Sequence, residues 1–425
     1  MRERAGRSTE VFVIGGGPAG LAAAIAARLR GFRVMVADGA TPPIDKACGE
    51  GLMPDGLAAL RELGVELRRD DGFAFRGLRF LDEGSAVETR FPGIAGAGMG
   101  VRRAILQQRM VERAAALGVE FLWATPVVGV RDGGVEIARP TREVIAARWV
   151  VGADGSHSRV RKWSGLEEYT QKESRFAFRR HYLVAPWCDG AEVYWGTRGQ
   201  AYVTPVSAKE VCVVAITRHT ELRSDEILRE FPALLEQLSG AELTSSERGA
   251  VTSTRRLRRV TRGTFSEAAD ESQKADETVV NRLNVGRFNG AGLNVAPNAV
   301  GPEGCAGVAL IGDASGGVDA ITGEGLCLSF HQAVRLAEAL ERGELEQYER
   351  AHRKLAGRPN FMATMMLALD RRPMLRRRVL RVFTAEPEIF ARFVAVHVGE
   401  TSALHAARTG AMFGWRLLAA SAGAR

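Results

Sequence analysis

The sequence predicts an α/β fold, with α+β character overall, and three observations lead to this prediction. Near the N-terminus, a short buried-type strand runs into a glycine-rich turn and then into an alanine-rich helix. Alternating segments rich in aromatic residues follow in the middle of the chain, and residues 341–425 have a mainly helical pattern. We therefore expect a three-layer nucleotide-binding domain, an inserted antiparallel β-sheet domain and a helical C-terminal region.

The composition is that of an ordinary globular protein. Of the 425 residues, 46% are apolar and 25% are charged, which excludes a wholly disordered or fibrous chain. A chain of this length corresponds to roughly three domains. The 58 basic residues, almost all arginine, outnumber the 50 acidic ones, but they are scattered and no nucleic-acid-binding module accompanies them. We therefore expect no nucleic acid partner.

The cysteines indicate a reducing compartment. The five cysteines form no C-x-x-C pair and no Cys/His cluster, so neither a disulfide framework nor a metal site is expected. The uncharged stretch 11–27 is interrupted by glycines and is followed by no small-residue cleavage site. This pattern argues against a secretory or transmembrane segment, and we expect the protein in the cytoplasm.

The first predicted element is a Rossmann-like βαβ unit, with strands at 10–14 and 32–38 and a helix at 21–29. A G-x-G-x-x-G turn precedes the helix, and the second strand ends in an acid. Such glycines let the backbone approach a pyrophosphate at the helix N-terminus, while the acid accepts from ribose hydroxyls. An acid here indicates an unphosphorylated ribose, as in FAD or NAD. The candidate cofactor-binding residues are Gly15, Gly17, Pro18, Ala19, Gly20 and Asp38.

Two later strands end in carboxylates that suit the same cofactor. One strand begins at residue 149 and the other at residue 308, and each leads into a turn that contains aspartate and glycine. A Gly-Glu-Gly sequence then begins the helix 326–342, whose free N–H groups can face a developing negative charge on a flavin ring. The candidate residues are Asp154, Gly155, Gly312, Asp313, Gly323, Glu324 and Gly325.

These three motifs, in this order, resemble the p-hydroxybenzoate hydroxylase-like flavoprotein superfamily, which includes aromatic hydroxylases, geranylgeranyl reductases and flavin halogenases. The resemblance spans residues 11 to about 340 and implies a Rossmann-like three-layer FAD-binding domain with FAD as the cofactor. It implies that Asp313 faces the ribityl and pyrophosphate region and that Arg103, next to Arg102, is a further FAD contact. It also implies NAD(P)H as a transient reductant, since no second complete dinucleotide fingerprint is present.

Other motifs bear on the branch of the superfamily. The loop 45–51 is similar to the Lys-x-Cys-Gly loop of geranylgeranyl reductases. Gly316 and Ala320 stand where aromatic hydroxylases typically carry histidine and proline, which also favours the reductases. However, the aromatic strand typical of those reductases is reduced here to Tyr202 and Pro205. The Trp-x-Trp motif and catalytic lysine of halogenases are not found in the sequence.

Three residues are candidates for catalysis: Cys48, Glu50 and Glu324. The resemblance places the loop that carries Cys48 and Glu50 near the isoalloxazine ring. Cys48 is then either a thiol beside the flavin or a small buried hydrophobe. Each glutamate is either a proton donor or acceptor, or a residue that caps a helix or pairs with an arginine.

The substrate platform is expected in the aromatic, strand-rich segments 73–90 and 176–216. A sheet laid over the flavin is what the resemblance implies, and an aromatic lining suits an apolar or aromatic ligand. The candidate lining residues are Tyr194, Tyr202 and Pro205. The alternative is that these side chains only build the core of the sheet.

The predicted domains follow from this order of segments. The FAD-binding domain is discontinuous and comprises 1–72, 98–165 and 306–340. The substrate-binding β-sheet domain comprises 73–97 and 166–262, and 341–425 forms the helical C-terminal region. Residues 263–305, rich in asparagine and polar side chains, are interpreted as an inserted loop or a partly disordered segment, which is either a lid or a surface insertion without a function.

The segment 371–381 interleaves apolar and basic positions. This pattern is typical of a helix that contacts an anionic membrane surface or an acidic carrier protein, and more commonly of a solvated helix face. A peripheral location at the membrane is therefore an alternative to a purely cytoplasmic one.

Three functions stay open at this point. The first is an NAD(P)H-driven flavin monooxygenase that hydroxylates or epoxidises a hydrophobic or aromatic small molecule, and it is favoured because that activity is common in the superfamily. The second is a geranylgeranyl-reductase-like enzyme that reduces a C=C bond of a prenyl or polyketide chain. The third is a non-catalytic flavin-binding partner protein, which a complete cofactor apparatus makes the least favoured.

Overall fold

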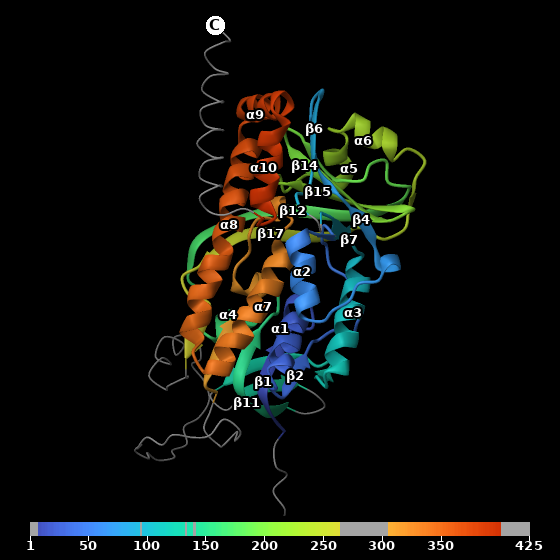
Figure 1. Ribbon diagram of the computed structural model, residues 1–425. Helices are drawn as coiled ribbons and strands as arrows, with labels where there is room; N and C mark the ends of the chain where they lie inside the picture. Colours follow the sequence, from blue (N-terminus) through green and yellow to red (C-terminus); the bar gives the residue numbers. More distant parts are fainter. Residues whose placement is uncertain (1–6, 94–95, 132–133, 139–141, 264–304, 401–425) are drawn as a thin grey trace, which may run out of the picture.

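The computed structural model describes residues 7–93, 96–131, 134–138, 142–263 and 305–400 (Figure 1). Two large sheets lie at opposite ends of the molecule, and helices from the C-terminal part run along both. The predicted α/β class, with α+β character overall, is confirmed. The domain boundaries stay predictions, and the segment interpreted as an inserted loop lies almost entirely outside the described residues.

The first sheet has a parallel core in the order β19-β11-β1-β2-β8, and β18 adds an antiparallel edge beside β19. Strands β9 and β10 form an antiparallel extension of β11. Their bounds are β1 (Ser8–Ile14), β2 (Val34–Ala37), β8 (Glu120–Leu122), β9 (Val127–Arg131), β10 (Gly134–Ala138), β11 (Arg142–Gly152), β18 (Thr261–Gly263) and β19 (Gly307–Leu310).

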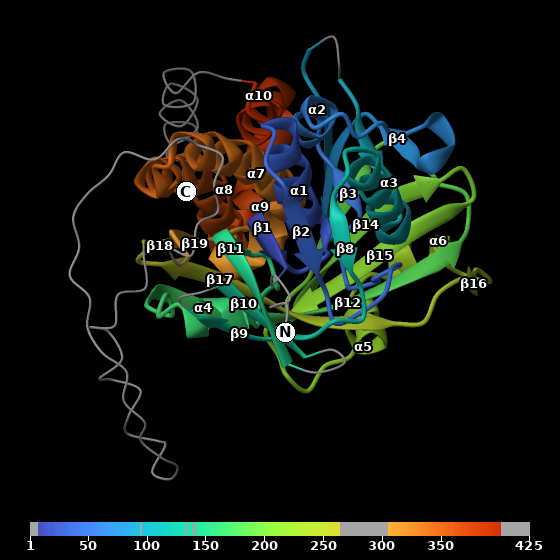
Figure 2. The ribbon, with the colours of Figure 1, turned by 90° about the horizontal axis from the view of Figure 1, so that it is seen from below.

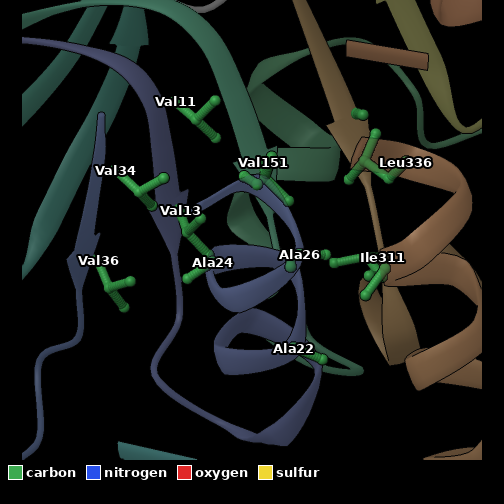
Figure 3. Packing of buried hydrophobic residues seen from close by; sticks show 14 of the residues in the cluster. Val11, Val13, Ala22, Ala24, Ala26, Val34, Val36, Val151, Ile311 and Leu336 are labelled. Atoms are coloured by element: carbon green, nitrogen blue, oxygen red, sulfur yellow. The ribbon is translucent and has the colours of Figure 1, made fainter. Parts of the chain in front are cut away.

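Helices cover one face of this sheet, and the β9–β10 extension lies on the other side, which gives three layers (Figure 2). The helices are α1 (Pro18–Leu29), α2 (Pro54–Glu62), α3 (Arg103–Ala116) and α7 (Gly325–Arg342), and the short α4 (Arg159–Trp163) follows β11. The alanines of α1 let the helix approach the sheet closely, and Ala24 lies beside Val13 of β1 (Figure 3). This packing fixes the turn between β1 and α1.

The second sheet has the order β16-β12-β15-β14-β13-β5-β6, and β17 pairs with β12. Its strands are β5 (Gly77–Asp82), β6 (Ser85–Arg90), β12 (Tyr169–Leu183), β13 (Ala191–Trp195), β14 (Gly199–Ser207), β15 (Glu210–Thr217), β16 (Glu242–Leu243) and β17 (Arg248–Leu257). The sheet is antiparallel as predicted, except that β5 and β13 pair in parallel. Helices α5 (Ser224–Leu228) and α6 (Pro232–Gln237) pack on its outer face.

A small three-stranded sheet connects the two large ones. It consists of β3 (Gly51–Leu52), β4 (Phe73–Phe75) and β7 (Gly98–Gly100) in the order β3-β7-β4. A methyl group on Gly100 would lie 1.8 Å from the carbonyl oxygen of Pro205, so the backbones of β7 and β14 are in direct contact. Short 3-10 turns complete the fold at Arg69–Asp71, Gly312–Ser315 and Ala320–Thr322.

The C-terminal part is helical, as predicted. It consists of α8 (Leu345–Arg371), α9 (Pro373–Ala385) and α10 (Pro387–His397). Helix α8 runs from the first sheet to the second, and α9 and α10 pack on β5 and β6 (Figure 1). Within the described part of the chain, no helix combines the length and apolar character required to cross a membrane.

The basic segment 371–381 covers the end of α8 and most of α9. Several of its arginines pair with acids of the same chain: Arg376 with Asp82, Arg377 with Glu83 and Arg371 with Glu173. Its apolar positions at Val379 and Leu380 are buried. The charge of this segment is therefore partly neutralised within the fold.

Candidate functional site

A cavity of about 1020 Å³ lies between the carboxyl ends of the parallel strands and the inner face of the second sheet. Four chain segments that follow β1, β2, β11 and β19 reach it, as expected for a ligand site of a parallel sheet. The predicted residues that line it are Gly15, Gly17, Pro18, Ala19, Asp38, Cys48, Glu50, Arg103, Asp154, Gly155, Tyr202, Gly312, Asp313, Gly323 and Gly325.

The glycines of the first turn have different roles. Gly15 has φ +114°, and a side chain there would lie 2.4 Å from the carbonyl oxygen of Ala153. Gly20 lies within α1, where a side chain would lie 1.9 Å from the carbonyl oxygen of Gly15. Gly17 faces open space, since its nearest neighbour is a guanidinium nitrogen of Arg103 at 3.7 Å. Gly15 and Gly20 therefore allow tight packing, whereas Gly17 leaves room for a ligand at the N-terminus of α1.

Asp38 holds the turn together. Its Oδ2 accepts a hydrogen bond from the Gly16 N–H at 2.7 Å, and its Oδ1 accepts one from the Ala40 N–H at 2.8 Å. The carboxylate lines the cavity while it makes these bonds. It thus stands at the place where a ribose is predicted, with its orientation fixed by the backbone.

Arg103 and Asp154 carry buried polar atoms that have no hydrogen-bond partner among the described residues, namely Arg103 Nε and Asp154 Oδ1. The other oxygen of Asp154 accepts from the Arg159 N–H at 2.7 Å and so caps α4. Arg102 pairs instead with Glu210 at 2.6 Å and does not line the cavity. Of the two neighbouring arginines, Arg103 is therefore the one that lines the cavity.

The third motif surrounds the start of α7. Gly312 and Gly323 adopt φ values of +60° and +67°, which favour glycine. A side chain on Gly325 would meet no atom within 4 Å, so the first turn of α7 is open to the cavity. Glu324, between the last two glycines, is buried, with 1% exposure, and does not line the cavity.

These residues fit a flavin dinucleotide. The turn at Gly17 and the start of α7 at Gly325 offer open backbone N–H groups, which suit a pyrophosphate and an electron-rich ring. The two unpaired buried atoms of Arg103 and Asp154 require a partner, and a bound ligand can supply it.

Glu50 occupies a strained and fully engaged position in the loop 45–51. It has φ +57°, which is rare for a residue with a side chain, and it is 2% exposed. Its Oε1 accepts from the Arg103 N–H at 3.0 Å, and its Oε2 lies 2.6 Å from His181 Nε2. Such strain persists only where surrounding contacts over-determine it. In this structure Glu50 therefore holds the backbone of Arg103 in place.

Sequence reasoning missed Arg179 and His181, which hold this loop from β12. Arg179, fully buried, donates from Nη2 to both oxygens of Asp45 at 2.7 Å, and its Nη1 lies 2.8 Å from His181 Nδ1. A guanidinium only donates, so His181 Nδ1 accepts, and the Nε2–H of the same ring donates a hydrogen bond to Glu50 Oε2. Burial raises the pKa of Asp45, but the hydrogen bonds and charge of Arg179 outweigh it and lower the pKa overall.

The thiols near the cavity stay protonated at neutral pH. Burial raises the pKa of Cys48, although the charge of Arg103 opposes the rise. Burial likewise raises the pKa of Cys212 well above its ordinary value. Cys212 lies near Glu50 and His181, but those two side chains bond each other, and Arg179 stands 4.0 Å from Glu50. The neighbouring positive charge disfavours a metal ion at this cluster.

The inner face of the second sheet forms an apolar chamber. Its lining residues include Phe75, Leu78, Phe80, Ala177, Ala191, Val193, Tyr202, Val214, Ile216, Met366, Phe393 and Val394. The hydroxyl of Tyr202 lies 3.2 Å from both Gln200 Oε1 and the Ile321 carbonyl oxygen, so it bonds to the turn before α7. Burial raises the pKa of Tyr202 well above its ordinary value.

Two predicted lining residues lie elsewhere. Tyr194 follows Val193 on β13, and successive side chains of a strand point to opposite faces. Its ring therefore packs against Phe231 on the outer face, and its hydroxyl donates to Glu192 at 2.9 Å. Pro205 does not line the main cavity, since its carbonyl oxygen contacts Gly100 of β7.

Fold and site together define a flavoprotein, with one cavity that extends from the strand ends of a parallel sheet to a second sheet. The chain belongs to the FAD-binding domain family, whose profile matches residues 8–349. The resemblance inferred from the three ordered motifs is thereby confirmed, and FAD is the cofactor of the family.

Among its relatives is a menaquinone reductase of Mycobacterium tuberculosis, 33% identical over 190 residues, which cover 42% of this chain and 47% of the relative. A rifampicin monooxygenase of Streptomyces venezuelae is 34% identical over 174 residues, which cover 37% of this chain and 34% of that protein. The chain thus matches half or less of the length of these relatives. In structure it is similar to the p-nitrophenol 4-monooxygenase PnpA of Pseudomonas putida, with TM-score 0.70, 18% identity and coverage of 92% and 99% of the two chains.

Proposed function

We propose that this protein is an FAD-dependent oxidoreductase, reduced by NAD(P)H, that acts as a monooxygenase on a hydrophobic or aromatic small molecule. The observation that carries the proposal is the single cavity, which continues from the glycine turn past the start of α7 into the apolar chamber. Cofactor residues and apolar wall residues line the same space, as a flavin that reacts with an apolar substrate requires.

The FAD-holding residues have separate tasks in this proposal. Gly17 and the N-terminus of α1 take the pyrophosphate, Asp38 accepts from the adenosine ribose, and Asp313 accepts from the ribityl chain. The start of α7 at Gly325 faces the ring. When bound, FAD supplies the two-electron chemistry; the protein supplies placement and electrostatics.

The chain's own residues shape the reaction space. The apolar wall formed by Phe80, Val193 and Ile216 excludes water, and exclusion of water strengthens the electrostatic interactions inside the site. Tyr202 remains protonated and ties the sheet to the turn before α7. The pair His181–Glu50 fixes the loop that carries Cys48.

A C=C reductase is the second candidate function. It is supported by the menaquinone reductase relative and by the loop at Cys48, which the sequence analysis compared with geranylgeranyl reductases. Because the thiol of Cys48 stays protonated, its role in such a reaction would be to donate a hydrogen bond or a proton rather than to act as a nucleophile.

Contact with a membrane surface or an acidic carrier protein through 371–381 stays a prediction. The ion pairs of Arg371, Arg376 and Arg377 within the chain leave less free charge for such a partner than the sequence indicates. Removal of membranes from the assay is therefore expected to leave flavin reduction unchanged.

The fate of dioxygen distinguishes the two reactions. The holoprotein is supplied with NADPH or NADH, isotopically heavy dioxygen and a panel of apolar aromatic compounds and prenyl alkenes, and the products are examined by mass spectrometry. Incorporation of one heavy oxygen atom is the expected result. A product that gains two hydrogens and no heavy oxygen, formed also without dioxygen, would establish the reductase instead. Flavin reduction by neither nicotinamide would contradict both.

A further inference from the structure

A buried acid and a buried imidazole face each other behind the start of α7. Glu324 is the residue that precedes the first turn of α7, and His397 is the last residue of α10. They are 1% and 4% exposed, and Glu324 Oε2 lies 3.5 Å from His397 Nδ1. Neither of these two atoms makes a hydrogen bond within the described part of the chain. Because buried polar atoms are almost always hydrogen-bonded, two such atoms that face each other indicate a proton between them.

The hydrogen bonds assign that proton to the acid. A hydrogen bond to the backbone of Thr322 opposes the fall in the pKa of His397, as a bond donated by the ring does, and Nδ1 makes no hydrogen bond within the described part of the chain. We therefore assign this bond to Nε2. A carbonyl oxygen accepts, so Nε2 donates to it and Nδ1 of the neutral ring presents a lone pair. A protonated Glu324 Oε2 can then donate to Nδ1, whereas an ionised carboxylate would meet a lone pair there.

The charged groups around the pair come from two further helices, α8 and α2. Arg358 of α8 lies 3.2 Å from Glu324 Oε1 and 2.7 Å from Asp55 of α2. Burial raises the pKa of Glu324 to about 8 against the charge of Arg358, and Asp55 adds to the rise. Burial, helped by Arg358, lowers the pKa of His397 to about 4. Burial also keeps the thiol of Cys327 in α7 protonated by raising its pKa.

We propose that Glu324 and His397 form a one-proton pair that keeps the acid neutral behind the flavin-facing end of α7 and thereby sets the reduction potential of the bound FAD. Glu324 stands between Gly323 and Gly325, which both line the cavity. A neutral acid leaves the positive end of the helix unopposed, whereas a carboxylate would repel negative charge placed on the ring. The proposal requires bound FAD and holds for either of the two reactions.

His397 also ties α10 to the cavity. The ring lines the cavity wall, and Gly399, just after α10, lies against the guanidinium of Arg358. Helix α10 therefore places the imidazole where it can accept a hydrogen bond from protonated Glu324, and we regard both side chains as positioning residues rather than reacting groups.

The test is the midpoint potential of the holoprotein measured by spectroelectrochemistry over a pH range that brackets 8. Above that value the potential is expected to fall more steeply with pH, because reduction of the ring then draws a proton onto Glu324. In Glu324→Gln, which keeps the shape and stays neutral, the steeper segment should be lost.

Two further variants make the result decisive. Glu349→Gln changes another buried glutamate, which accepts backbone hydrogen bonds from Val260 and Thr261 away from the cavity, and it should retain the steeper segment. His397→Gln should move the segment to lower pH, since a carboxamide can stabilise the ionised acid. This second variant decides the question if Glu324→Gln does not fold. A parent protein without the steeper segment, or Glu324→Gln or His397→Gln with an unchanged one, would overturn the proposal.

Discussion

At the scale of single residues, the glycine turn separates the requirements of the fold from those of the ligand. At Gly15 both the positive φ and the carbonyl of Ala153 exclude a side chain. At Gly17 the backbone has φ −76° and the nearest atom is 3.7 Å away, so a methyl group is compatible with the protein itself. We therefore expect that methyl group to clash with a bound pyrophosphate and with no protein atom.

This contrast predicts different outcomes for two similar variants. Gly17→Ala should change the free energy of unfolding of the flavin-free protein by less than about 0.5 kcal/mol, yet weaken FAD binding by about tenfold or more. Gly15→Ala should also weaken FAD binding and, unlike Gly17→Ala, should lower the free energy of unfolding by about 1 to 3 kcal/mol. Urea denaturation and fluorimetric FAD titration measure the two quantities. A Gly17→Ala protein with normal FAD affinity would show that the turn does not contact the cofactor.

The sequence predicts those residues whose partners are close in the chain. The turn at Gly15, Asp38 and the Gly312-Asp313 step belong to short motifs, and all of them line the cavity. Arg179 and His181 were missed because their partners Asp45 and Glu50 lie 134 and 131 residues away. One signal in the sequence could have found them. Arg179 and His181 are separated by one position on a predicted strand, so both side chains lie on the same face of it.

At the scale of elements, α9 shows how burial changes the meaning of a charge pattern. The sequence presents a row of arginines, and the structure buries one of them. Arg376 pairs with Asp82 at 2.9 Å, and both side chains are 2% exposed. Arg377, the next residue, pairs with Glu83 at the surface. The sequence alone could not show which of the two arginines is buried. Their partners Asp82 and Glu83 lie at the turn between β5 and β6, 294 positions earlier in the chain.

The two neighbouring arginines form a matched test. Arg376→Met leaves the buried carboxylate of Asp82 unpaired and should lower the free energy of unfolding by about 3 to 5 kcal/mol. Arg377→Met removes an exposed pair and should cost less than about 1 kcal/mol. Adding Asp82→Asn to Arg376→Met should restore part of the loss. Equal effects of the two single variants in chemical denaturation would contradict the assignment of a buried ion pair.

At the scale of the whole molecule, the cavity is made by two sheets together. The parallel sheet supplies the cofactor residues, and the second sheet, with α8 and α10, supplies the apolar wall. The sequence predicted both sheets, but not the parallel pairing of β5 with β13 or the contribution of α10 to the wall. Such contacts depend on how distant segments dock, and local periodicity carries no information on docking.

A ligand that contacts both sheets should stabilise the whole fold. With FAD about a thousandfold above its Kd, the free energy of unfolding should rise by about 4 kcal/mol over that of the flavin-free protein. Denaturation with and without FAD measures the gain, and Gly17→Ala serves as the control with a smaller gain at the same FAD concentration. A gain confined to one of two separate transitions would show that the flavin does not couple the sheets.

The parallel sheet also has a consequence for how the protein is made. Strand β19 pairs with β11, yet the two are separated in the chain by most of the second sheet, from β12 to β17. On the ribosome, β11 therefore emerges with an unpaired edge and must wait until Leu310 has been synthesised. Long-range pairing is slow, and open strand edges invite association with other chains. Translation speed and chaperone access, more than the stability of the finished protein, are therefore expected to govern its soluble yield.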